Sequence, residues 1–169
     1  MSILYPNNHY NSVHEIDYKQ LQVLGVKAII FDIDNTLVPY DILEPTPQVI
    51  GLIEKLQKDG FKLCLISNNN KNRVDLFNKE LKLPAIAKAY KPLSKNIKKG
   101  LALLGSQADQ TALIGDQMFT DVWGGNRVGL FTILVRPIQD KEEWITKIKR
   151  GIEKKVFKKY ISKKEKTND

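Results

Sequence analysis

Two carboxylates, Asp32 and Asp34, directly follow a short apolar run and are well placed to do chemistry. The run, residues 26–31, is apolar apart from Lys27, which is typical of a strand buried on both faces of a parallel sheet. In open α/β sheets, ligands bind outside the carboxyl ends of the strands. Two acids this close repel each other unless a cation lies between them, and oxygen ligands suit magnesium. The sequence therefore predicts a Mg²⁺ site at this strand end.

Polar side chains also follow three later apolar runs. In chain order, the four clusters are Asp32/Asp34/Thr36, Ser67/Asn68, Lys91 and Asp116/Asp121. Each cluster alone has an ordinary structural explanation, since Asp-x-Asp and Ser-Asn-Asn sequences are common in turns, Lys-Pro in loops and Gly-Asp at helix starts. Because the carboxyl ends of parallel strands meet at one edge of a sheet, their recurrence at successive strand ends favours a single site.

Alternating strands and helices are predicted to position these clusters. Apolar runs predict strands at residues 26–31, 61–67, 85–90, 111–116 and 131–137. Helices are predicted over about 13–24, 47–59, 71–80 and 95–105. Thr46 and Ser94 are the predicted N-caps of the second and fourth helices, while residues 1–13 are expected to be irregular. The alternation indicates an α/β, Rossmann-like three-layer fold with a mostly parallel sheet of about five strands.

Length and composition indicate one domain: the chain has 169 residues, 42% of them hydrophobic and 27% charged. We divide it into an N-terminal segment packing on the core (1–24), a core that carries the four clusters (25–140) and a basic helix with a frayed tail (141–169). There is no apolar run long enough to cross a membrane and no secretory signal pattern. The single cysteine, Cys64, is expected to be inert core packing and fits a reducing compartment, so we expect a cytoplasmic protein.

Positive charge is concentrated in residues 141–169, which hold 11 Lys/Arg and 5 Asp/Glu, or six of the eight net positive charges. Apolar residues recur there every four positions, at Trp144, Ile148, Ile152, Val156 and Tyr160, and predict one amphipathic helix from about Asp140. Two placements remain open. The helix can pack on the sheet, which we favour because the sheet needs cover, or it can lie on the inner face of the membrane with its lysines against anionic lipid.

The four clusters resemble the motifs of the haloacid dehalogenase (HAD) superfamily of phosphatases and phosphotransferases. The matching strings are FDIDNTL, LISNN, Lys91-Pro92 and IGDQMFTD, and the resemblance covers roughly residues 25–136. Within the superfamily the chain is most similar to the YqeG-type group of subfamily IIIA, through SNN followed by Arg73 and through the long string from Gly115 to Gly129. A related branch of that group includes phosphatidylglycerophosphate phosphatases.

The resemblance implies roles for the acids. Asp32 would be the nucleophile that forms an aspartyl-phosphate, and Asp34 would protonate the leaving alcohol and then deprotonate the attacking water. Magnesium would be held by Asp32, the backbone carbonyl of Asp34 and Asp116, with Asp121 as a further acidic group close to the metal.

The resemblance also implies roles for the other polar residues. Ser67 would hydrogen-bond the phosphoryl oxygens, and Lys91 would offset charge in the transition state. Thr36 and Asn68 are candidates for orienting the nucleophile loop. Arg73 and Arg127 are candidate anion contacts for a diester phosphate, or alternatively surface salt bridges.

The motif spacing leaves no room for the large cap domain that many HAD proteins insert, because the segments from Thr36 to Ser67 and from Ser67 to Lys91 are each used by a helix and a strand. Asn35 stands where many relatives have glycine, and asparagine is the side chain that best tolerates a left-handed turn. An open site favours large substrates such as a lipid headgroup, unless contacts in a homo-oligomer supply a lid.

We therefore expect a magnesium-dependent phosphomonoester hydrolase that acts on phosphatidylglycerophosphate. An alternative is a HAD phosphatase of a phosphoprotein, nucleotide or sugar phosphate. A second alternative is a nucleic-acid-associated module using the basic tail. Nucleic acid is not the expected partner, because the sequence shows no interleaved aromatic platform and no known binding motif.

Overall fold

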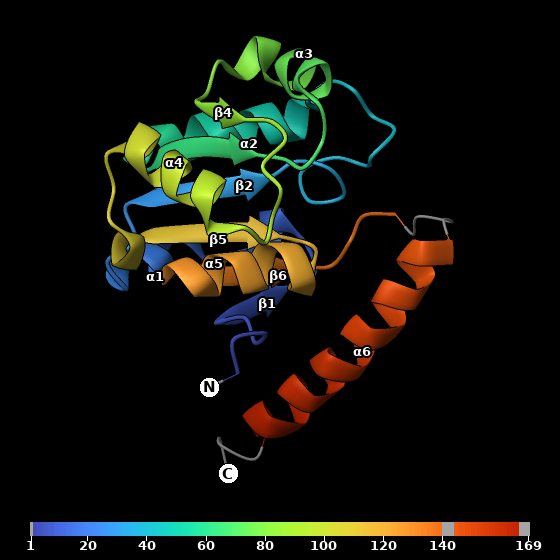
Figure 1. Cartoon of the computed structure of the whole chain (residues 1–169). Helices are drawn as coiled ribbons and strands as arrows, with labels where there is room; N and C mark the ends of the chain where they lie inside the picture. The colour runs from blue at the N-terminus through green and yellow to red at the C-terminus, as the bar shows by residue number, and fades with distance from the viewer. Residues whose placement is uncertain (1, 140–143, 166–169) are drawn as a thin grey trace.

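Six parallel strands form the central sheet of the protein, in the order β1-β6-β5-β2-β3-β4 (Figure 1). The computed structural model describes residues 2–139 and 144–165. The strands are β1 (Asn8–Tyr10), β2 (Ala28–Asp32), β3 (Lys62–Ile66), β4 (Ala85–Ile86), β5 (Thr111–Gly115) and β6 (Phe131–Val135). Every pairing is parallel, so all carboxyl ends lie along one edge. The predicted α/β class is confirmed.

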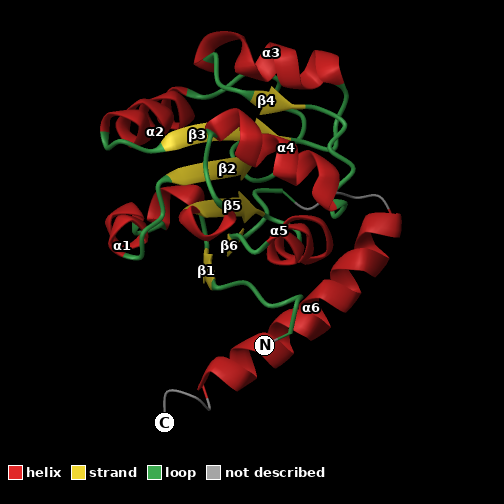
Figure 2. Ribbon diagram, turned by 60° about the vertical axis from the view of Figure 1, so that its left-hand side comes forward, coloured by secondary structure: helices red, strands yellow, loops and turns green. Residues whose placement is uncertain are grey.

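Helices cover both faces of this sheet (Figure 2). They are α1 (Tyr18–Val23), α2 (Pro47–Lys58), α3 (Lys71–Leu81), α4 (Ser94–Leu104), α5 (Trp123–Val128) and α6 (Trp144–Glu165), with the short helical turns η1 (Val13–Glu15), η2 (Ala108–Gln110) and η3 (Met118–Val122). Leu21, Ile53 and Phe77 bring α1, α2 and α3 into one apolar core, and Ile97 brings α4 into the core on the other face. The result is the three-layer arrangement that the sequence predicted.

The central strand β2 is buried at every residue, which explains its continuous apolar sequence. Its register places Asp32 beside Ile66 of β3 and Phe31 beside Ile114 of β5. The ends of the three strands are therefore aligned, and the residues that follow them converge. Cys64 on β3 is fully buried, and burial raises the pKa of its thiol to about 12, as expected of core packing.

The helix ends agree only in part with the predicted caps. Thr46 accepts a hydrogen bond from Val49 N, and Pro47 opens α2 as expected. Ser94 is instead the first residue of α4, which has no side-chain cap, so that cap prediction was wrong.

The N-terminal segment differs more from expectation. Residues 8–10 were predicted to be irregular, yet they form β1 and pair with β6. Asn7 fixes this edge, because its side chain accepts a hydrogen bond from Thr132 N at 2.8 Å. The predicted helix over 13–24 is divided into η1 and α1, which are capped separately by Ser12 and Asp17. A three-residue edge strand without apolar alternation gives no periodic signal.

Helix α6 packs on the side of the domain next to β1 and η3. Val156 and Phe157 pack against a small cluster of Met118, Val122 and Leu134. The side chains of Trp144 and Ile148, the predicted start near Asp140 and the end of the tail lie outside the described residues. Among the described helices, none has the length and apolarity needed to cross a membrane.

The segments between the first three motifs hold α2, β3, α3 and β4, and every residue there is described. The predicted absence of a large cap domain is confirmed.

Candidate active site

Three buried carboxylates meet at the carboxyl edge of the sheet. Asp32 ends β2, Asp116 follows β5, and Asp121 lies in η3. Each offers an oxygen within 4.8 Å of the oxygens of the other two, and each side chain is almost wholly buried. The sequence predicted that these residues would converge, and the aligned strand ends bring them together.

Lys91 is the cation of this cluster. Its Nζ lies 2.6 Å from Asp32 Oδ1 and 2.6 Å from Asp121 Oδ1. Its main chain is held by Asn68, whose Oδ1 accepts from Lys91 N at 2.7 Å and whose Nδ2 donates to Lys91 O. Asn68 thus positions the lysine from the end of β3.

Burial and mutual repulsion dominate the electrostatics of the acids. Burial raises the pKa of Asp32 to about 6; Lys91 opposes this, and Asp121 and Asp34 add to it. The pKa of Asp116 is also raised, first by burial and then by the charges of Asp32 and Asp121. Burial lowers the pKa of Lys91, but Asp121 and Asp32 outweigh it, so the net shift is upward. One ammonium group against three carboxylates leaves the cluster short of positive charge.

This donor set suits a hard divalent cation, which prefers oxygen ligands. The main evidence that these residues suit a cation is the excess of buried negative charge, because such a cluster is costly without a counter-charge. The ligand oxygens would come from Asp32, Asp116 and Asp121.

The turn after β2 brings Thr36 back to the cluster. Asn35 takes the left-handed conformation, with φ of 65°, as its residue type allowed. Thr36 Oγ1 then donates to Asp32 Oδ2 at 3.1 Å and lies 3.4 Å from Asp116 Oδ1. Asn35 also accepts from Ile138 N through its carbonyl, so the loop after β2 contacts the segment leading toward α6.

Asp34 has a different environment from Asp32. Arg73 donates to Asp34 Oδ1 from Nη2 at 3.0 Å and from Nε at 3.2 Å. The same guanidinium donates to the backbone carbonyls of Ile42 and Leu43, and its side chain is only 7% exposed. Arg73 therefore holds Asp34 and the following loop, and four of its five N–H donors are occupied within the protein.

Two side chains at the end of β3 complete the surroundings of Asp34. Ser67 Oγ and Asn69 Nδ2 each donate to Asp34 Oδ2 at 3.3 Å. Asn69 was missed from the sequence, although it stands in the same Ser-Asn-Asn run that drew attention to Ser67.

Gly115 was also missed. A Cβ at this position would lie 2.2 Å from Asp121 Cγ, so only glycine leaves room for that carboxylate. The sequence signal was the Gly-Asp pair at the end of the β5 run, whose ordinary explanation was the start of a helix. Asp121 is further fixed because its Oδ2 accepts from Gln117 N at 3.1 Å.

Arg127 is not brought to the cluster. It is an exposed residue near the end of α5, close to where β6 begins, and its guanidinium lies 5.8 Å from the centre of the Trp123 ring. That position is at the amino edge of the sheet, opposite the acids. Arg136, at the carboxyl end of β6, shares a pocket with Thr36 and Asp116 and was not singled out from the sequence.

Comparisons with known proteins agree with this geometry. A family profile described as HAD-hydrolase-like matches residues 88–157. The chain is 38% identical to "Probable phosphatase YqeG" of Bacillus subtilis over 152 residues, which cover 90% of this chain and 88% of that protein. It is 29% identical to "Phosphatidylglycerophosphate phosphatase 1, chloroplastic" of Chlamydomonas reinhardtii, over 84% of this chain but only 56% of that protein.

A solved structure of similar fold is the HAD phosphatase of Thermococcus onnurineus, with a TM-score of 0.57 and 17% identity over 70% of this chain and 90% of that one. At that identity the likeness concerns the fold alone. The similarity to the Bacillus protein extends over nearly the whole chain and so spans the residues whose side chains converge here. The chain therefore belongs to the haloacid dehalogenase (HAD) superfamily of phosphatases, in the group of the Bacillus subtilis YqeG protein.

Proposed function

We propose that the protein is a magnesium-dependent phosphomonoester hydrolase that works through an aspartyl-phosphate on Asp32. The observation that carries this proposal is the position of Asp32, held between Lys91 and Thr36 beside two further buried acids. Asp32, Asp116, Asp121 and the backbone carbonyl of Asp34 would hold Mg²⁺. When bound, the ion would reduce the repulsion between an anionic nucleophile and an anionic phosphate.

In the first half-reaction, an oxygen of Asp32 attacks phosphorus and the bond from phosphorus to the leaving alcohol oxygen breaks. Asp34 gives its proton to that oxygen. In the second half-reaction, Asp34 takes a proton from water, the water oxygen attacks phosphorus, and the bond to Asp32 breaks. Lys91 and Ser67 offset the charge on the transferring group.

Asp34 is oriented for this exchange by Arg73, Ser67 and Asn69. We assign Arg73 to positioning rather than to substrate binding, because it is buried and four of its five N–H donors are already used by Asp34 and two carbonyls.

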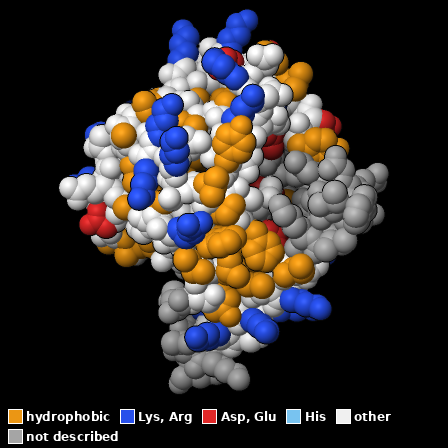
Figure 3. All heavy atoms as spheres, in the orientation of Figure 1, with side chains coloured by type: hydrophobic (Ala, Val, Ile, Leu, Met, Phe, Trp, Pro, Cys, Tyr) orange, Lys and Arg blue, Asp and Glu red, His pale blue; other side chains and the backbone are white. Residues whose placement is uncertain are grey.

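For the substrate, we propose phosphatidylglycerophosphate, which would yield phosphatidylglycerol. The name of the Chlamydomonas relative supports this choice. The absence of a large cap also supports it, because an open site suits a headgroup presented at a lipid surface. Exposed lysines along α6, visible at the bottom of Figure 3, would favour an anionic membrane.

The test is phosphate release from phosphatidylglycerophosphate in mixed micelles, compared with p-nitrophenyl phosphate, a nucleotide and a sugar phosphate. We expect Mg²⁺-dependent release with the lipid as the best substrate, and none above background from Asp32→Asn. Good turnover of the soluble phosphates with no turnover of the lipid would overturn the lipid assignment and leave the reaction type intact.

A further inference from the structure

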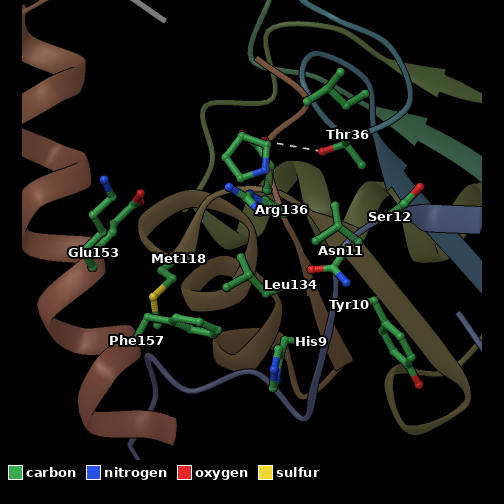
Figure 4. Close-up of a pocket in the computed structure, with 15 residues that line it drawn as sticks. His9, Tyr10, Asn11, Ser12, Thr36, Met118, Leu134, Arg136, Glu153 and Phe157 are labelled. Carbon is green, nitrogen blue, oxygen red and sulfur yellow. Dashed lines mark hydrogen bonds between the residues drawn. The ribbon is translucent and has the colours of Figure 1, made fainter. Parts of the chain in front are cut away.

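A groove of about 890 Å³ leads away from the acids along the β1–β6 side of the domain (Figure 4). Thr36 and Asp116 line it at the catalytic end. Thr36 and Asp116 belong to both the acid cluster and the groove. When the reacting phosphate of a substrate lies at the cluster, its leaving group therefore lies along the walls of the groove.

Helix α6 forms the far wall of the groove through Glu153, Lys154 and Phe157. Several side chains of α6 attach this wall to the domain. Glu153 accepts a hydrogen bond from Phe119 N at 3.3 Å, and Phe157 meets His9 edge-on, with 5.2 Å between the ring centres. The chain thus encloses one side of its site without a cap domain.

The groove also has a cationic side chain close to the catalytic end. Arg136 follows β6 directly, and its main chain is fixed because Arg136 N donates to Tyr10 O. Its side chain is exposed and makes no ion pair with another described side chain. Arg73, in contrast, is buried against Asp34. Arg136 is therefore available to an anion. Glu153, the acid on the α6 wall, already accepts a hydrogen bond from Phe119 N.

We propose that this groove holds the leaving-group part of the substrate and that Arg136 binds a second phosphate on it. The assignment rests on the proposed phosphatase reaction at Asp32. The ligand chemistry is a phosphate linked through a short polyol to the reacting phosphate, which is found both in a lipid headgroup and in a soluble bisphosphate. Met118, Leu134 and Phe157 offer apolar surface to any carbon skeleton that extends beyond the second phosphate.

The test compares glycerol 1,3-bisphosphate with glycerol 3-phosphate, which differ only in the second phosphate. We expect the wild type to prefer the bisphosphate in kcat/KM, and Arg136→Gln to lower that preference by about tenfold, the low end expected for a charge-assisted contact that water can reach. Arg136→Lys should recover part of it. The matched control is Lys19→Gln, an exposed cation on α1 at the opposite edge of the sheet, which should keep the wild-type preference.

A binding measurement separates this inference from the reaction. In an Asp32→Asn background, calorimetric affinity for glycerol 1,3-bisphosphate should fall about tenfold with Arg136→Gln and stay level with Lys19→Gln. Equal affinity with and without Arg136 would overturn the groove assignment even if the enzyme is active. If Asp32→Asn keeps full activity but the Arg136 effect on binding is present, the proposed reaction fails and the groove assignment stands. Phosphatidylglycerophosphate in micelles, assayed alongside, shows whether the lipid source is preferred to the soluble one.

Discussion

At the scale of residues, the two acids of the first motif differ in the side chains that contact them, which their spacing in the sequence does not reveal. Asp32 is buried with Lys91 and two other carboxylates, while Asp34 is tied to Arg73. Two donors of Arg73 hold Asp34 Oδ1, and Ser67 and Asn69 hold Oδ2, so the carboxylate has a fixed orientation. If Asp34 is the general acid and base, its rate of proton transfer should therefore depend on Arg73, which does not touch the substrate.

Replacing Arg73 by lysine should keep the charge but lose the paired geometry. We expect kcat to fall by about ten- to a hundredfold for alkyl phosphates, whose leaving oxygen needs a proton, with a small change in KM. The loss should be clearly smaller for p-nitrophenyl phosphate, because p-nitrophenolate leaves readily without one.

Lys71→Gln is the control, because this exposed lysine on the same helix pairs with Asp75 rather than with Asp34. It should leave both rates near wild type. An equal loss on the two kinds of substrate in Arg73→Lys would show that Arg73 acts by another route.

At the scale of elements, the site depends on how tightly η3 approaches the end of β5. Gly115 admits the Asp121 carboxylate, and Gly124 on α5 leaves room for Ile97 of α4, which a Cβ would approach to 2.8 Å. These contacts place the acid of η3 beside Lys91.

Gly115→Ala should displace Asp121 and weaken the apparent affinity for Mg²⁺ by about ten- to a hundredfold, measured as Mg²⁺ activation of hydrolysis. Gly51→Ala is the matched control, because nothing lies within 4 Å of a Cβ at that exposed position of α2. It should raise the free energy of unfolding by about 0.5–1 kcal/mol and leave Mg²⁺ activation unchanged. Wild-type Mg²⁺ activation in Gly115→Ala would contradict this account of η3.

The sequence predicted the elements that have periodic or continuous apolar patterns, and these include the strands before the four clusters. It did not predict β1, because Asn8–Tyr10 join the sheet through backbone hydrogen bonds and the side chain of Asn7. The pairing of Asp34 with Arg73 joins residues 39 positions apart and has no local signal. The groove proposed to use Arg136 depends on where α6 packs, which an amphipathic stripe does not specify.

At the scale of the whole molecule, the buried acids connect folding to pH and to the metal. The folded-state pKa values of Asp32 and Asp116 are raised, so the folded protein binds protons more tightly than the unfolded chain. By linkage, both groups make the metal-free protein less stable as pH rises, and for Asp32 this loss runs from about pH 4 through about pH 6. A bound cation would offset this loss, because it stabilises the ionised acids.

Thermal unfolding from pH 5 to pH 8 should show this coupling. The gain in Tm on replacing EDTA with Mg²⁺ should be small at pH 5 and should grow above pH 6, as protons cease to compete for the carboxylates. Asp116→Asn should show a smaller gain and, in EDTA, a weaker pH dependence than the wild type. A gain that is the same at pH 5 and pH 8 would mean that the metal does not bind these acids.

The central claim is that Asp32 becomes phosphorylated, and the direct measurement is mass spectrometry of an acid-quenched reaction. Asp34→Asn with p-nitrophenyl phosphate is the best condition, since this leaving group needs no acid while breakdown of the intermediate needs the missing base. The account predicts one phosphoryl group on the peptide containing Asp32, at the Asp32 side chain, and none in the Asp32→Asn protein. A phosphoryl group on another residue, or steady turnover with Asp32 unmodified, would contradict it.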